Sequence, residues 1–194
     1  MMGIWQLTES VGELPHPKCV STNDLHSEMR IRERLVSHEL VRRLTGMENF
    51  QIGHESSGRP VLDGWNISIS HTRGWAVVIL SKEASVAVDV EYVSERVNRV
   101  ADRFIRPDEP FSNQDELSED NEKSSLLGRL INWCAKETAY KFYSEEDLQY
   151  FEMRLLPFRP QSQGFVVVED LKVPKHLEVN YETNAEFVLT WAVG

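Results

Sequence analysis

The stretch that decides the fold is VAVDVE, residues 86–91, in which valine stands at every second position. This period of two predicts a β-strand. Asp89 and Glu91 are two positions apart, so their carboxylates leave the same face of that strand. An alternating strand at 65–70 and a continuous apolar strand at 75–80 are predicted before it. The stretch therefore closes a group of three strands and presents a pair of carboxylates on one face.

Outward from this stretch, helices and strands follow one another in blocks. Residues 24–45 have the apolar spacing of an amphipathic helix, which Asp24 would cap and Gly46 would end. The segment 82–85 has the length of a hairpin turn. The polar and mostly acidic segment 112–125 is predicted to be a mobile surface loop. A helix followed by strands occurs twice, which predicts an α+β fold of two similar halves. The other predicted elements are a strand at 2–8, helices at 94–106 and 125–143, and strands at 151–156, 164–170, 176–182 and 186–192.

The composition argues against several classes of function. The chain has 194 residues and a formal net charge of -10, which argues against a general nucleic-acid-binding protein. No apolar run approaches the ~20 residues of a membrane span, and the first residues lack the pattern of a signal peptide. Cys19 and Cys134 are far apart, which fits a reducing cytosol with Cys134 as a buried thiol. An anionic substrate would need a local basic patch, for which the candidates are Arg30, Arg32, Arg34, Arg42, Arg43, Arg96, Arg99, Arg103 and Arg106.

A second acidic motif is WCAKETAYK, residues 133–141, in a predicted helix. Glu137 and Lys141 are four positions apart and share one helical face. The alternative is an ordinary surface pair, just as Asp89 and Glu91 could lie on a solvated strand face. Three carboxylates with nearby lysines are also the groups that hold a hard divalent metal and a polyphosphate. The combined pattern favours chemistry at a phosphate.

Two further motifs could contact a phosphate. His71 ends a predicted strand and could donate to a phosphate oxygen, although a lone histidine more often makes a structural hydrogen bond. Arg59 lies in the turn GRP, residues 58–60, and could bind a phosphate through its guanidinium, although a solvated turn arginine is commoner. The sequence has no Walker loop, no GxGxxG, HExxH or GxSxG motif, and no metal-ligand spacing among its six histidines. The carboxylates are therefore the leading candidates for metal ligands.

Taken together, these motifs resemble those of the 4′-phosphopantetheinyl transferase superfamily, in its larger, surfactin-synthetase-type subtype. That subtype is built as a pseudo-dimer, which implies two similar α/β-sheet halves over residues 1–95 and 96–194. The resemblance covers roughly residues 25–143, with Thr72 where the family often has serine. The five motifs, in the family's order, are GRP at 58–60, ISISHT at 67–72, VDVE at 88–91, RFIRPDE at 103–109 and WCAKETAYK at 133–141.

The resemblance implies a role for each matching residue. The residues that would hold Mg²⁺ against the coenzyme A diphosphate are Asp89, Glu91 and Glu137. The implied contacts with coenzyme A are Arg59 and Ser70 at the adenosine end, His71 and Lys141 at the phosphates, and Lys136. The implied catalytic residues are Glu109, Glu137 and Lys141. Glu109 would be the general base for the carrier serine, with Asp108 as the alternative in a register shifted by one.

The implied activity is the Mg²⁺-dependent transfer of the 4′-phosphopantetheine arm of coenzyme A to a serine of an apo acyl or peptidyl carrier protein, a post-translational modification. The acidic carrier would dock on the helix after Glu91, which presents Arg96, Arg99 and Arg103. We further expect a cytoplasmic monomer with no nucleic-acid or membrane partner. The alternative is a non-catalytic module that binds coenzyme A or a carrier protein on the same fold.

Overall fold

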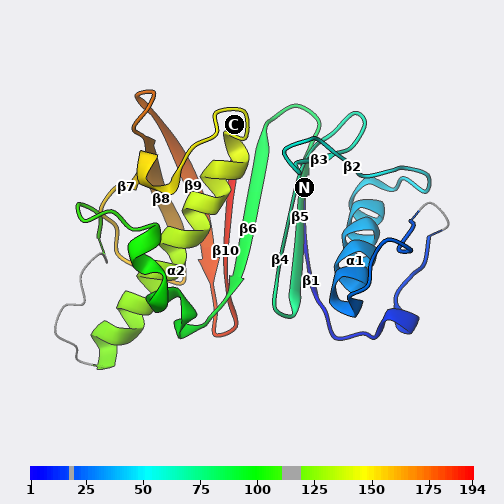
Figure 1. Ribbon diagram of the computed structural model, residues 1–194, viewed down its shortest axis with the longest axis horizontal. Coiled ribbons are helices and arrows are strands. Elements are labelled where there is room, and N and C mark those ends of the chain that lie inside the picture. Colours follow the sequence, from blue (N-terminus) through cyan, green and yellow to red (C-terminus); the bar gives the residue numbers. More distant parts are fainter. Residues whose placement is uncertain (18–19, 111–118) are drawn as a thin grey trace. The chain divides into compact units, whose positions relative to one another are not determined.

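The computed structural model describes residues 1–17, 20–110 and 119–194. The chain divides into two compact units, one of Met1–Val90 with Val193–Gly194 and one of Glu91–Ala192 (Figure 1). Each unit combines one long α-helix with antiparallel strands. The predicted α+β combination of helices and strands is therefore confirmed. The packing of two halves as a pseudo-dimer stays a prediction.

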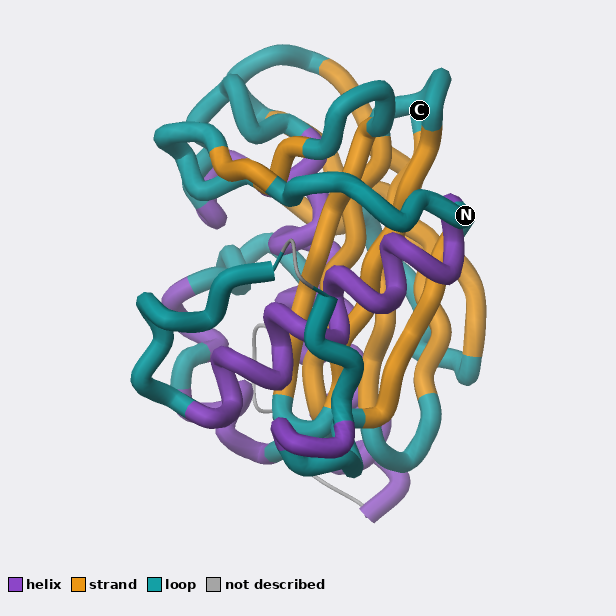
Figure 2. The backbone as a smooth tube through the Cα atoms, turned by 90° about the vertical axis from the view of Figure 1, so that its right-hand side faces the viewer, coloured by secondary structure: helices purple, strands orange, loops and turns teal. Residues whose placement is uncertain are grey.

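The first unit is a helix on a three-stranded antiparallel sheet. Its elements are β1 (Met2–Gln6), η1 (Val11–Glu13), α1 (Glu28–Thr45), β2 (Gly53–His54), β3 (Pro60–Val61), β4 (Asn66–Thr72) and β5 (Trp75–Ser81). The sheet has the order β1-β5-β4, and β2 pairs with β3 in a separate ribbon. Helix α1 crosses one face of the sheet (Figure 2). The next strand, β6 (Val86–Tyr92), runs from the first unit into the second.

Apolar side chains of α1 form the core of the first unit. Leu35, Val36 and Val41 are buried against strand residues such as Val78. Burial of each such side chain stabilises the fold by about 1.5–3 kcal/mol. The helix ends at Gly46, as predicted, where a φ of 73° suits a residue without a Cβ atom.

Two predictions for this unit are wrong. The helix α1 begins after Ser27 and not at Asp24, whose carboxylate pairs instead with Arg34 at 2.6 Å between Oδ1 and Nη1. The segment 82–85 is not a hairpin turn, because β1 and β4 occupy both edges of β5. Sequence spacing predicted the strands here, but their order in the sheet depends on packing.

Glu39 is a buried carboxylate on α1 that two arginines hold. Its Oε2 accepts a hydrogen bond from Arg42 Nε at 2.8 Å, and its Oε1 accepts one from Arg43 Nε at 2.7 Å. The hydrogen bond from Arg42 is the main cause of a lowered pKa of Glu39, against burial, which raises it. We expect Glu39→Gln to lower the free energy of unfolding near neutral pH by roughly 1.5–3 kcal/mol, the range for hydrogen bonds to charged groups.

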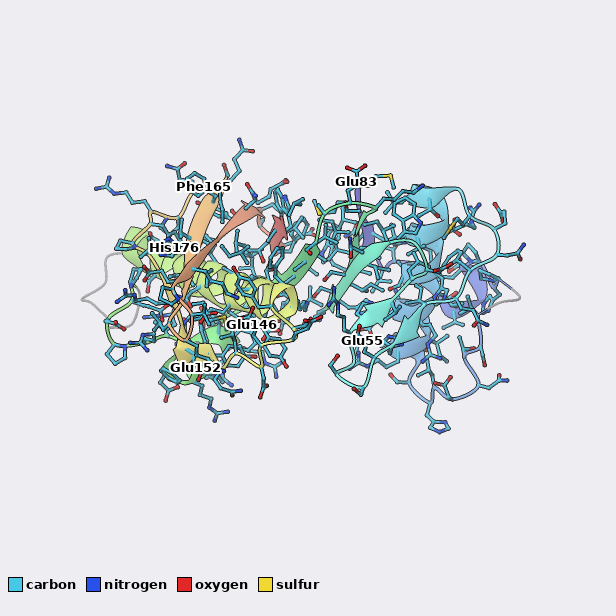
Figure 3. The ribbon with its side chains drawn as sticks, turned by 90° about the horizontal axis from the view of Figure 1, so that it is seen from above. Glu55, Glu83, Glu146, Glu152, Phe165 and His176 are labelled. Carbon is cyan, nitrogen blue, oxygen red and sulfur yellow. The ribbon has the colours of Figure 1, made fainter. Side chains whose placement is uncertain are left out.

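This effect has a defined pH dependence. Because the folded-state pKa of Glu39 is lowered, its charge stabilises the native protein above the ordinary carboxyl pKa of about 4.3. The contribution is lost as the pH falls through the lowered folded-state pKa. Urea denaturation at several pH values should therefore show a difference between native protein and variant that shrinks in acid. The control is Glu83→Gln, since Glu83 is exposed and points outward in Figure 3; a difference for Glu39→Gln that stays constant into strong acid would contradict this account.

The second unit is a helix on an antiparallel sheet with more strands than the sheet of the first unit. Its elements are η2 (Glu95–Arg99), η3 (Ala101–Arg103), α2 (Glu119–Phe142), η4 (Tyr150–Glu152), β7 (Met153–Leu155), β8 (Gln163–Asp170), β9 (Lys175–Thr183) and β10 (Phe187–Val193). The strands follow the order β10-β9-β8-β7. Helix α2 buries Cys134 completely, as predicted for a thiol on an apolar face. Glu146 and Glu152 lie on the α2 side, whereas Phe165 and His176 lie on the other face of the sheet (Figure 3).

The predicted helix over 94–106 is wrong. The chain instead forms the two short turns η2 and η3, separated at Val100 by a non-helical backbone with φ of -125° and ψ of 4°. A β-branched valine loses side-chain freedom in a helix, which favours a break there. After the break, the sequence neighbours Phe104 and Ile105 are both buried in the core.

The predicted acidic loop falls partly on helix α2. Its residues up to 118 lie outside the described residues. From Glu119 onward the segment is helical, so the loop prediction is wrong for 119–125. The dipole of a helix favours carboxylates near its N-terminus, so an acidic composition is compatible with the first turns of a helix.

Candidate active site

Strand β4 brings two serine hydroxyls against β6 inside the first unit. Ser68 Oγ accepts a hydrogen bond from the N–H of Val88 at 3.2 Å, and Ser70 Oγ accepts one from the N–H of Val90 at 3.4 Å. The Ser70 hydroxyl donates to Asp89 Oδ1 at 2.7 Å. Asp89 is only 4% exposed, which excludes a solvated strand face for this carboxylate.

In the second unit, an aromatic pair connects two carboxylates. Glu91 is the penultimate residue of β6, and Glu137 lies on α2. Trp133 Nε1 donates to Glu91 Oε1 at 3.2 Å, and the Tyr150 hydroxyl donates to Glu137 Oε1. The Trp133 and Tyr150 rings are in contact, with 5.2 Å between their centroids. The structure therefore gathers into one cluster two carboxylates that are far apart in the sequence.

Next to this cluster, Glu109 and Lys136 form an ion pair with no exposed side-chain surface, at 2.7 Å between Oε2 and Nζ. Lys136 Nζ also donates to the carbonyl oxygens of Phe104 at 2.6 Å and Tyr150 at 3.2 Å. Glu109 Oε1 accepts from the N–H of Leu155 at 2.6 Å. Burial lowers the pKa of Lys136, and the carboxylate of Glu109 opposes that shift.

The burial of this pair bears on two predicted roles. A general base must reach the serine proton that it abstracts, directly or through one water. The Glu109 side chain is fully buried and both of its oxygens accept hydrogen bonds, and the Lys136 ammonium has no surface for coenzyme A. The geometry favours a structural role for both residues. Their catalytic and coenzyme A roles stay predictions that this placement disfavours.

A cavity of about 530 Å³ opens in the first unit beside α1, β2 and the end of β4. Its ionisable lining residues are Arg30, Glu33, Arg34, His38, His54 and His71. Basic side chains outnumber the one glutamate in the lining, although Arg30 is paired with Glu33 at 3.0 Å and Arg34 with Asp24 at 2.6 Å; we refer to it as the basic cavity. The predicted phosphate contact His71 lies in the lining of this cavity.

Hydrogen bonds fix the tautomers of two histidines in this cavity. The Ser37 hydroxyl donates its one proton to the carbonyl oxygen of Glu33 at 2.8 Å. In the 2.9 Å contact between Ser37 Oγ and His71 Nε2, the imidazole N–H is therefore the donor and the hydroxyl oxygen the acceptor. His38 Nδ1 lies 2.9 Å from the carbonyl oxygen of Arg34 and therefore donates to it. Burial lowers the pKa of His38, which favours its neutral form.

The remaining predicted residues lie at the edges of these two sites. Arg59 is half-buried between Gly58 and Pro60, which both line the basic cavity. Lys141 is half-buried in the last turn of α2, one helical turn after Glu137. Both positions are compatible with contact to a bound anion, which stays a prediction.

The predicted metal ligands are distributed over both units. Asp89 belongs to the first unit, and Glu91 and Glu137 belong to the second. Within the part of the chain that the structure describes, no group of three or more His, Cys, Asp or Glu side chains could hold a metal ion. The chemistry of the set nevertheless fits Mg²⁺, which prefers carboxylate oxygens. Hydrogen bonds from Trp133 and Tyr150 are of the kind that orient metal-binding carboxylates.

Sequence reasoning missed three residues of these sites. Tyr150 lies in the short turn η4, which no apolar period or motif indicates. Ser37 and His38 lie on α1, one turn after Glu33 and Arg34. Their helical spacing could have indicated a polar stripe facing the basic cavity.

Comparison with sequence models of known families gives a match. The sequence model of the 4′-phosphopantetheinyl transferase superfamily matches residues 85–192, more than half of the chain. The chain therefore belongs to this superfamily, which supports a phosphopantetheine transferase role in general and implies coenzyme A and a carrier protein as partners. A search of curated proteins found no match. Among the described residues, neither α1 nor α2 has a stretch long and apolar enough to cross a bilayer.

Proposed function

We propose that this protein transfers the 4′-phosphopantetheine arm of coenzyme A to a serine of an apo acyl or peptidyl carrier protein, in a reaction that requires Mg²⁺. The observation that carries the proposal is the cluster of Glu91, Trp133, Glu137 and Tyr150, which lies within the matched residues. The enzyme would be of the surfactin-synthetase type, a pseudo-dimeric chain that acts as a cytoplasmic monomer.

The basic cavity of the first unit supports binding of the nucleotide end of coenzyme A. Arginine and protonated imidazole groups form strong hydrogen bonds to phosphate oxygens. His71 would contact a phosphate from β4, and Arg59 would approach from the turn beside the cavity. Lys141 would add a further phosphate contact from the end of α2.

Three carboxylates are proposed to act at the diphosphate of coenzyme A, where the reaction takes place. Asp89, Glu91 and Glu137 would hold Mg²⁺, which when bound neutralises the diphosphate and stabilises the leaving group. The serine oxygen forms a bond to the phosphorus that bears the pantetheine arm, and adenosine 3′,5′-bisphosphate leaves. The serine proton passes to a carboxylate, directly or through water. The complete burial of Glu109 disfavours it as that base and leaves Glu137 and the partly exposed Asp108 as candidates.

The turns η2 and η3 support docking of an acidic carrier. Arg96, Arg99 and Arg103 are exposed there. A cavity of about 280 Å³ lies beside them and includes Val97 and Trp133 in its lining. The three arginines outnumber the exposed acidic residues of these turns, Glu95 and Asp102, and this excess of positive charge suits an acidic protein that presents one side chain to the site.

Arg99→Glu tests this docking surface. We expect the KM for the carrier to rise roughly tenfold, equivalent to about 1.4 kcal/mol, because a repulsive charge weakens association. The KM for coenzyme A should stay unchanged. Arg159→Glu is the matched control, since Arg159 is an exposed arginine outside these turns. Equal losses for both substrates, or equal effects of both variants, would exclude the docking surface.

The direct test of the activity is mass spectrometry of an apo carrier protein after incubation with this protein, coenzyme A and Mg²⁺. A gain of one phosphopantetheine arm that EDTA prevents would support the proposal. Binding of coenzyme A without transfer to any of several acyl and peptidyl carriers would favour the non-catalytic binding module instead.

A further inference from the structure

Tyr150 occupies a position between the buried ion pair and the candidate metal ligands. Its hydroxyl donates to Glu137 Oε1, and its carbonyl oxygen accepts from Lys136 Nζ at 3.2 Å. The successive residues Lys136 and Glu137 of α2 therefore hydrogen-bond to the main-chain carbonyl and to the side-chain hydroxyl of Tyr150. The turn η4 is also fixed locally, since Glu152 accepts from the N–H of Gln149 at 2.8 Å.

The tyrosine ring is fixed by aromatic contacts as well. It packs on Trp133, whose ring in turn meets Phe104 edge-on at 4.9 Å between centroids. The indole of Trp133 donates to Glu91. The aromatic pair Trp133–Tyr150 thus supplies one hydrogen bond to each of two carboxylates that come from different elements.

We propose that Tyr150, together with Trp133, is a positioning residue that fixes Glu137 and Glu91 in the orientation that binds the divalent metal. This inference rests on the proposed function. A glutamate side chain has three rotatable bonds, and holding it in one orientation before the metal arrives removes an entropic cost of binding. A neutral donor on one oxygen keeps the carboxylate charge and leaves the group further acceptor sites. Loss of such an outer contact typically lowers metal affinity about 10- to 100-fold.

Tyr150→Phe tests the inference, because it removes one oxygen atom and keeps the ring on Trp133. We expect calorimetric titration with Mg²⁺, in the presence of coenzyme A, to show an affinity about 10- to 100-fold lower than in the native protein. Transfer should be restored by raised Mg²⁺, so that the variant changes the Mg²⁺ requirement more than kcat. Tyr140→Phe is the matched control, since Tyr140 lies on α2 and is 41% exposed.

Trp133→Phe provides a second test that keeps an aromatic ring and removes the other donor. This variant should also lower the Mg²⁺ affinity. If Tyr150→Phe fails to fold, Trp133→Phe still tests whether the aromatic pair positions the carboxylates. Native Mg²⁺ affinity in a folded Tyr150→Phe or Trp133→Phe variant would overturn this inference and leave the proposed function intact. Absence of Mg²⁺ binding by the native protein with coenzyme A would overturn both.

Discussion

Replacing Asp89 with asparagine is expected to reduce arm transfer by roughly 10²- to 10³-fold, the loss that follows removal of one preorganised electrostatic group from an active site. Asparagine has the shape of aspartate, and its side-chain oxygen can still accept the hydrogen bond from Ser70. The fold should therefore survive while a negatively charged metal ligand is lost. The measurement is the initial rate of carrier modification, by mass spectrometry, at saturating coenzyme A and Mg²⁺.

The control for this change is Asp63→Asn, because Asp63 is exposed in the turn before β4. Both variants should melt within a few degrees of the native protein. If Asp89→Asn retained the full rate and the same sensitivity to EDTA, the assignment of Asp89 as a metal ligand would be wrong.

Lys136→Met is expected to give the largest loss of stability, about 3–5 kcal/mol in the free energy of unfolding. Methionine fills much of the space but leaves the Glu109 carboxylate buried without its cation, and breaking a buried ion pair on one side has this cost. Two further hydrogen bonds of Lys136 are lost, to the carbonyl oxygens of Phe104 and Tyr150. Urea denaturation should show a lower midpoint with little change in slope.

The double variant Lys136→Met with Glu109→Gln separates charge burial from packing. Removing both charges should recover part of the loss, because no unpaired ion then remains in the core. Lys172→Met is the surface control, since Lys172 pairs with Glu152 at 3.5 Å and is partly exposed; its effect should stay within about 1 kcal/mol. A loss below about 1 kcal/mol for Lys136→Met would contradict a structural role for the pair.

Sequence periodicity predicted most of the regular elements. The amphipathic helix over 24–45 corresponds to α1, and the apolar run at 75–80 corresponds to β5. The loop prediction was wrong at the start of α2, where it was based on acidic composition and not on periodicity. The helix prediction was wrong around Val100, where the segment forms two short 3-10 turns. Two local effects account for these places: the helix dipole favours carboxylates in the first turns of α2, and a β-branched valine favours a break at Val100.

The candidate site was predictable only in part. The motifs placed Glu91 and Glu137 on particular faces of a strand and a helix, and His71 at the end of a strand. The structure adds the hydrogen-bond donors of the two carboxylates, Trp133 for Glu91 and Tyr150 for Glu137. Tyr150 could not be predicted, because a single residue in an irregular turn has no period that reveals its direction.

The sequence by itself determined which side chains share a face, because the repeats of helix and strand fix the direction in which each side chain leaves the backbone. It also determined the acidic charge and the order of the carboxylate motifs. Only the tertiary structure decided that Asp89 is buried against Ser70, that Lys136 is buried with Glu109, and that a tyrosine reaches Glu137. Direction is a local property of the chain, whereas burial and hydrogen-bond partners depend on remote segments that meet only in the folded protein.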